Sequence, residues 1–292
     1  MACLIPEQDY EWGTMPMLFR LLKNGLQFCR MQPLGAFGLL IIIVMAVCAM
    51  FAEYVTFYNP EAVDFAAMLS GPSADHPFGT DSFGRDIFTR IVYGARTALT
   101  IGFLSSMIGC HIGAAIGIIS AYHGGWVDLV LQRFIDIILS FPIVVLALVV
   151  VAVMGKTMFL GIDLNLVFAI AVAAVMAIRK QPYGDAARAG GYSTLHILMR
   201  YIAPNVSAPF LVLVTAYIAQ AILLEASLSF LGLGVTEPKP AWGLMLAGDS
   251  ANFYNEAPWM ILFPGLAISL SVFAFNLFGD SLRDWFDPKY RN

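Results

Sequence analysis

Long stretches without a single Asp, Glu, Lys or Arg recur along the chain. A bilayer core about 30 Å thick is crossed by about 20 helical residues, and a charge at its centre costs a few kcal/mol. Charge-free stretches of this order predict six transmembrane helices, near residues 34–56, 98–121, 134–154, 162–178, 206–229 and 258–278. The pattern therefore predicts an all-α fold, a polytopic membrane helix bundle over 34–278, with segments 1–33 and 279–292 outside it.

Composition supports a membrane protein. Of the 292 residues, 59% are hydrophobic and 12% are charged, whereas about 25% of the residues of a soluble domain are charged. The mean hydropathy is +0.77. With 16 Lys and Arg against 20 Asp and Glu, the net charge of −4 argues against a nucleic-acid partner. The surface of such a chain is expected to contact membrane lipid.

The distribution of Lys and Arg predicts the orientation, because these residues concentrate in cytoplasmic loops. Six spans put both termini on one side. Segments on that side hold eleven Lys and Arg, and the opposite side holds five: Arg85, Arg90, Arg96, Lys156 and Lys239. Both termini are therefore predicted to be cytoplasmic, and the three arginines before the second span are predicted to lie at the membrane interface.

No catalytic, metal or cofactor site emerges from the motifs. Gly155-Lys156-Thr157 resembles the end of a phosphate-binding loop, but Val150 stands where that motif needs its first glycine, and no strand precedes it. The four histidines lie in separate segments without the spacing of metal ligands. We expect no disulfide among the four cysteines, since two lie in predicted spans and two on the cytoplasmic side. The chain is predicted not to be an enzyme.

Two features inside the spans leave alternatives open. Glu225 lies deep in the fifth predicted span, where an acid either lines a polar pathway or forms a buried structural hydrogen bond. Glycines repeat at every fourth position from Gly109 to Gly117 in the second span. Such a stripe lets another helix approach closely, either within the bundle or in a dimer.

The cytoplasmic loop 179–205 has the pattern of two short helices joined by Gly190-Gly191. Ser193 is placed to cap the second helix, which Pro204 would end. Small residues at 186, 187 and 189 give the first helix a surface that a partner's groove could enclose. A helix pair that is not part of the bundle indicates docking to a soluble partner; an amphipathic surface helix without a partner is the alternative.

This loop resembles the coupling motif of bacterial ABC importer permeases: Glu-Ala-Ala, three residues, Gly, then a stretch ending Ile-x-Leu-Pro. Here the motif appears as Asp185-Ala186-Ala187, Gly191 and 201–204. Further blocks resemble the dipeptide/oligopeptide/nickel permease family and, in their order, its "C" permease subunit: 76–86, Arg90, 93–96, 225–234, 241–243 and 275–284.

The resemblance implies a type I ABC importer permease of the bacterial inner membrane. Its expected partners are a homologous second permease in a heterodimer, two ATP-binding subunits that hydrolyse ATP, and an external substrate-binding protein. It assigns coupling to the ATPases to residues of the loop: Asp185, Ala186, Ala187, Arg188, Gly191 and Pro204. The physical interpretation agrees, because small residues allow close docking and glycine permits a sharp turn.

The chain departs from the family pattern in three places. Asp185 replaces the usual glutamate, and Ala203 replaces leucine. Between Ala171 and Arg179 the chain is shorter than members of the family. The fourth predicted span, 162–178, would then measure about 25 Å against a core of about 30 Å. Either the adjoining residues 179–182 or a thinner membrane completes it, or the gene product lacks a segment that coupling needs.

These observations lead to one hypothesis about function. The chain is predicted to be the permease subunit of an ATP-driven importer that moves peptides or a similar small solute by alternating access. An ion-coupled secondary transporter is the alternative, and it would need inverted repeats and clustered intramembrane acids. A structural membrane subunit without transport is a third option. The sequence does not identify the substrate.

Overall fold

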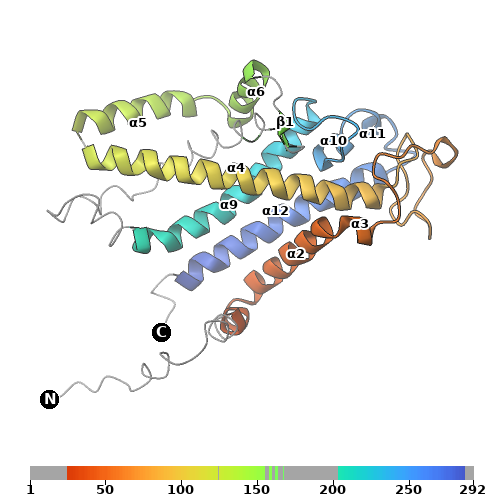
Figure 1. Ribbon diagram of the computed structural model, residues 1–292, viewed down its shortest axis with the longest axis horizontal. Coiled ribbons are helices and arrows are strands. Elements are labelled where there is room, and N and C mark those ends of the chain that lie inside the picture. The colour runs from red at the N-terminus through yellow and green to blue at the C-terminus, as the bar shows by residue number, and fades with distance from the viewer. Residues whose placement is uncertain are drawn as a thin grey trace, which may run out of the picture.

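The computed structural model describes residues 25–123, 125–154, 158–159, 162–163, 167 and 203–286, and nearly all of them are helical (Figure 1). The long helices are α2 (Pro33–Met50), α4 (Ile87–His123), α5 (Gly125–Leu139), α6 (Ile143–Met154), α9 (Ala203–Phe230) and α12 (Trp259–Phe286). Short helices are α3 (Ala52–Val55), η3 (Phe65–Ala67), α10 (Trp242–Leu246) and α11 (Asp249–Asn252). Two antiparallel strands of two residues, β1 (Met158–Phe159) and β2 (Ile162–Asp163), pair locally. The predicted helix-bundle fold class is confirmed.

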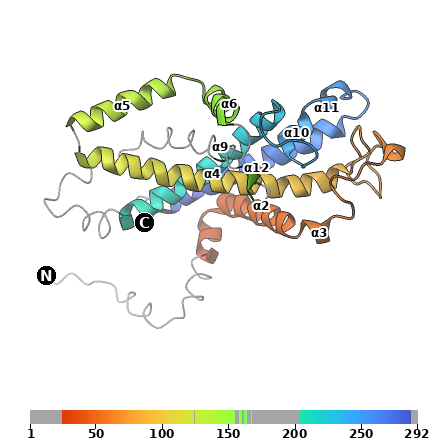
Figure 2. The same ribbon diagram turned by 45° about the horizontal axis from the view of Figure 1, so that its top comes forward.

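Four long helices, α2, α4, α9 and α12, run side by side through the molecule (Figures 1 and 2). Helix α12 packs against α2 and α9, and α9 packs against α4. Each of the four has a stretch long and apolar enough to cross a membrane. Buried side chains of α4, α9, α10 and α12 form the main core, and many large apolar side chains on the outer faces are exposed, as a lipid environment requires.

Helix α4 is longer than the sequence predicted. The charge-free pattern placed its start near residue 98, but the helix begins at Ile87. Arg90 and Arg96, which the prediction excluded from the helix, lie in its first three turns. Arg90 is buried and paired with Glu237, whereas Arg96 is partly exposed and donates to the Ala49 carbonyl. A paired charge does not have to remain in water, so it does not mark the end of the helix.

The third predicted span, 134–154, is not one straight helix. Helices α5 and α6 meet at an angle of 91° across the break at 140–142. Pro142 causes this break, because it lacks an N–H group and disfavours helical geometry at Phe141. Counted together, the bent pair is a fifth candidate crossing among the described residues.

The remaining predictions about spans cannot all be compared with the structure. Of the fourth predicted span, 162–178, only 162–163 and 167 are described, and 162–163 belong to β2 rather than to a helix. Most of the loop 179–205 also lies outside the described residues, as do 1–24 and 287–292. The number of spans and the side of each terminus therefore remain predictions.

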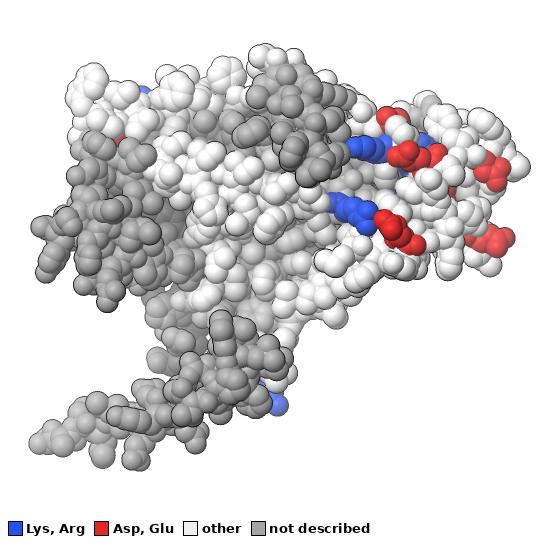
Figure 3. Space-filling view, in the orientation of Figure 1, with Lys and Arg blue, Asp and Glu red and all other residues white. Residues whose placement is uncertain are grey.

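A compact segment, 56–86, in which η3 is the only helix, closes one end of the bundle. We call this the external end, after the side on which the charge distribution places it. Thr80 anchors the segment, since its N–H donates to the Ser70 carbonyl at 2.9 Å and its carbonyl accepts from the Trp259 indole at 3.0 Å. Most charged side chains visible in Figure 3 gather at this end, while the sides of the helices are nearly free of charge.

Candidate functional site

A tight turn at Asp81 places an arginine at the external end. One carboxylate oxygen of Asp81 accepts from the backbone N–H groups of Phe83 and Arg85, both at 2.9 Å. Gly84 has a φ of +72°, and a Cβ there would overlap the carbonyl of Asp64, so glycine is required. The turn directs the Arg85 side chain towards the loop that follows α9.

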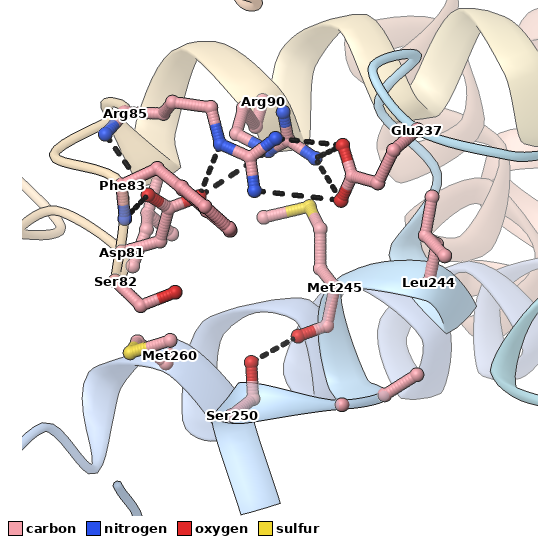
Figure 4. A pocket seen from close by; sticks show the side chains of 13 residues that line it. Asp81, Ser82, Phe83, Arg85, Arg90, Glu237, Leu244, Met245, Ser250 and Met260 are labelled. Carbon is pink, nitrogen blue, oxygen red and sulfur yellow. Dashed lines mark hydrogen bonds and ion pairs between the residues drawn. The ribbon is translucent and has the colours of Figure 1, made fainter. Parts of the chain in front are cut away.

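Arg85 and Arg90 share one carboxylate from that loop (Figure 4). Arg85 Nη1 donates to Glu237 Oε2 at 2.6 Å, and Arg85 Nε donates to Asp81 Oδ2, also at 2.6 Å. Arg90 Nη2 lies 3.4 Å from Glu237 Oε1. We call Arg85, Arg90, Asp81 and Glu237 the arginine clamp.

The clamp joins segments that lie far apart in the sequence. The Arg90 side chain is only 1% exposed, and its Nη1 donates to the carbonyls of Pro60 and Pro238 at 3.1 and 3.4 Å. Burial lowers the pKa of Arg85, but the hydrogen bonds and charges of Glu237 and Asp81 outweigh burial and raise this pKa above its ordinary value. Arg85 therefore stays charged at every working pH.

A cavity of about 250 Å³ opens beside the clamp. The two arginines form one end of it, and apolar side chains of α10 and α12, among them Leu244, Met245 and Met260, form its walls (Figure 4). Charged groups at one end and flexible apolar groups along the walls suit a small ligand with a charged terminus.

Glu225 is held in a buried hydrogen-bond chain at the end of α9. Its side chain is buried, and its Oε1 accepts from the Ser229 hydroxyl at 2.7 Å. The same hydroxyl accepts from the Val235 N–H at 3.0 Å. Gly232, with a φ of +78°, ends the helix in a Schellman motif, which brings residue 235 back to Ser229. This geometry supports the structural interpretation of Glu225, and the pathway role stays a prediction.

The structural role and the pathway role of Glu225 predict different stability and uptake for its variants. Glu225→Gln keeps an oxygen that accepts from Ser229, so we expect little change in the thermal stability of the purified transporter. Glu225→Leu removes the acceptor from a buried hydroxyl and should cost about 1–3 kcal/mol. A pathway role would instead appear as lost uptake in Glu225→Gln at unchanged stability.

The sequence-predicted coupling residues Asp185, Ala186, Ala187, Arg188 and Gly191 lie outside the described residues. Pro204 lies in the first turn of α9, and the helix predicted to end before it lies outside the described residues. Proline fits there because the first N–H groups of a helix have no intrahelical acceptor.

The glycine stripe of α4 divides along its length. Gly109 and Gly113 are buried within this chain, which favours packing inside the bundle. A Cβ at Gly117 would meet no atom within 4 Å.

Two of the three arginines that the sequence placed at the interface are buried in the protein, and Arg96 is partly exposed. Arg85 and Arg90 are buried in the clamp, and Arg96 Nε donates to the Ala49 carbonyl at the end of α2, at 3.0 Å. The sequence did not indicate Glu237 as their partner. The only signal was the presence of three arginines on the side that is usually poor in positive charge.

Comparison with known proteins decides the family. The sequence profile described as "Binding-protein-dependent transport system inner membrane component" matches residues 113–292. The chain belongs to this family. It is therefore a permease subunit of an ABC transport system in the inner membrane, rather than an enzyme, and it works with ATPase and binding-protein partners.

Relatives with similar sequences span nearly the whole chain. The dipeptide transport system permease protein DppC of Alkalihalophilus pseudofirmus is 41% identical over 298 residues, covering 98% of this chain and 94% of the relative. The glutathione transport system permease protein GsiD of Pectobacterium atrosepticum is 37% identical, covering 91% and 90%. A putative peptide transport system permease protein of Brucella suis is 38% identical, covering 87% of each.

The blocks that carry the family resemblance meet at the external end, apart from 275–284, which lies in the second half of α12. Arg85 and Arg90 come from the first blocks, and Trp242 of the 241–243 block donates to the Ile91 carbonyl at 2.9 Å. A Cβ at Gly243 would overlap the carbonyl of Ala226, so the 225–234 and 241–243 blocks touch backbone to backbone. The external end of the bundle is thus built from these blocks.

Proposed function

We propose that this permease subunit imports peptides or a similar small solute by alternating access, beside a homologous second permease and above two ATP-binding subunits. The similarity to the dipeptide, peptide and glutathione permeases over 87–98% of the chain carries the proposal. The four apolar helices and the closed external end support it, because an importer needs a membrane bundle and a surface at which solute is received.

We further propose that the loop 179–205 transmits the ATPase motion to the bundle, through Asp185, Ala186, Ala187, Arg188 and Gly191. Pro204, in the first turn of α9, would join the loop to a helix that packs against both α4 and α12. Motion of the loop would then reach both neighbours of α9.

The comparison with DppC supports the prediction that the chain is shortened between Ala171 and Arg179. That alignment runs over 298 residues, more than the 292 of the whole chain, so the relative has residues without a counterpart here. We propose that some of them belong to the fourth span and its cytoplasmic end.

Uptake by cells tests the substrate class. A strain without this gene should lose accumulation of radiolabelled dialanine when the other subunits are present, and the intact gene should restore it. Excess unlabelled dipeptide should compete, whereas free alanine should not. If deletion of this gene left dialanine accumulation unchanged in a strain whose other peptide transporters are also deleted, a peptide substrate would be contradicted.

A further inference from the structure

Glu237 is the most exposed member of the clamp. Its side chain is 48% exposed, whereas those of Arg85, Arg90 and Asp81 are 10%, 1% and 11% exposed. Its carboxylate accepts one short hydrogen bond, from Arg85 Nη1 at 2.6 Å, but it contacts Arg90 only at 3.4–3.5 Å, longer than a charge-assisted hydrogen bond usually is. Glu237 can therefore leave the clamp at a smaller cost than the other three groups.

Asp81 is held by more hydrogen bonds from its own turn than Glu237 is. It accepts two backbone N–H groups and the Nε of Arg85, so it is part of the turn that positions this arginine. Asp81 lies 3.9 Å from Arg90 Nε, which has no hydrogen-bond partner although it is buried. Without Glu237, Arg85 would keep only Asp81, and Arg90 would have no carboxylate of the described residues within hydrogen-bond distance. A carboxylate is the anion whose planar geometry a guanidinium group matches best.

The adjoining cavity offers space for the rest of such a ligand. Met245 and Met260 line it together with Leu244. Methionine side chains are flexible and polarizable, so they can pack against side chains of different shapes. A carboxylate receptor with adaptable walls fits a class of ligands that share a terminus and differ in their side chains.

We propose that Arg85 and Arg90 bind the terminal carboxylate of a peptide, and that Glu237 occupies this site when no peptide is present. The proposal rests on the peptide substrate proposed above. Entry of a peptide displaces Glu237, which removes the ion pairs that tie the loop between α9 and α10 to the two arginines. The peptide side chains then lie against the methionines of the cavity.

Direct binding to the complete transporter in lipid nanodiscs, without binding protein or nucleotide, tests this site. The probes are dialanine, N-acetyl-dialanine, which keeps the carboxylate, and dialanine amide, which lacks it. We expect the first two to bind and the amide to bind at least about tenfold more weakly, because a neutral amide that displaced Glu237 would not replace the anion that Glu237 supplies to the arginines. Equal affinity for the acid and the amide would overturn the proposal.

The Glu237→Gln variant tests the competition. If Glu237 fills the clamp about nine-tenths of the time, its removal raises the affinity for dialanine about tenfold. Glu256→Gln, which removes an exposed acid at the same end outside the clamp, should leave the affinity unchanged. Unchanged or weaker binding by Glu237→Gln would show that the clamp is only a structural tie.

Two further measurements separate the outcomes. Leu244→Trp partly fills the cavity, so it should weaken dialanine binding at least about tenfold. This variant tests the site even if Glu237→Gln fails to assemble, and unchanged dialanine binding by Leu244→Trp would contradict the site. ATP-driven dialanine uptake by the same wild-type transporter reports on the proposed function. If uptake occurs but acid and amide bind equally, the carboxylate site alone is wrong; if dialanine is not taken up, the peptide substrate itself is wrong.

Discussion

Replacing Gly243 with alanine is expected to prevent stable assembly of the permease. A Cβ at this position in α10 would overlap the carbonyl oxygen of Ala226 and lie 2.6 Å from its carbonyl carbon, both in the backbone of α9. Backbone atoms cannot move aside as a flexible side chain can, so we expect a cost above about 3 kcal/mol. Thermal unfolding and membrane yield of the purified transporter measure the effect.

Gly265→Ala is the matched control for this prediction. It adds the same methyl group to α12, where no atom lies within 4 Å of the new Cβ. Because alanine favours a helix over glycine by roughly 0.5–1 kcal/mol, this variant should be as stable as the wild type or slightly more stable. Equal stability of Gly243→Ala and Gly265→Ala would mean that α9 and α10 do not touch as described.

Reversing the charge at Asp185 is expected to abolish transport while the subunits still assemble. If the loop 179–205 docks into the ATPases, Asp185→Arg brings a positive charge into a groove that normally receives a carboxylate. Like charges at an interface cost several kcal/mol, so ATP-driven uptake should fall at least about tenfold. Uptake by transporter reconstituted into liposomes, compared with its ATPase activity, measures the loss of coupling.

Asp185→Glu is the control, because it keeps the charge and restores the residue usual in the motif. We expect it to transport as well as the wild type. Gly191→Pro provides a second test at a different position, since proline fixes φ near −65° and removes the N–H. Full uptake by Asp185→Arg or by Gly191→Pro would show that coupling uses other residues.

The amino-acid sequence predicted the helices well where a single physical rule governs them. Charge-free stretches mark α2, α9 and α12 because the membrane excludes unpaired charge. The rule failed at the start of α4, where Arg90 is buried against Glu237. It also failed at Pro142, whose effect is on the backbone rather than on hydropathy.

The arginine clamp shows why a site is harder to predict than a helix. Arg85 and Asp81 are four residues apart, and their pairing follows from a local turn. Arg85 and Glu237 are 152 residues apart, so no local spacing relates them. Only the fold brings the loop after α9 next to the start of α4. The sequence could indicate that the external arginines were unusual, but it could not name their partner.

The central claim is that this chain forms part of an ATP-driven, binding-protein-dependent importer. The most direct test uses liposomes that contain the complete transporter, with ATP trapped inside and binding protein with radiolabelled dialanine outside. We predict that dialanine accumulates only with both ATP and binding protein, and that a proton ionophore leaves its rate unchanged. Accumulation without ATP that collapses when the ionophore is added would contradict the account and identify an ion-coupled secondary transporter.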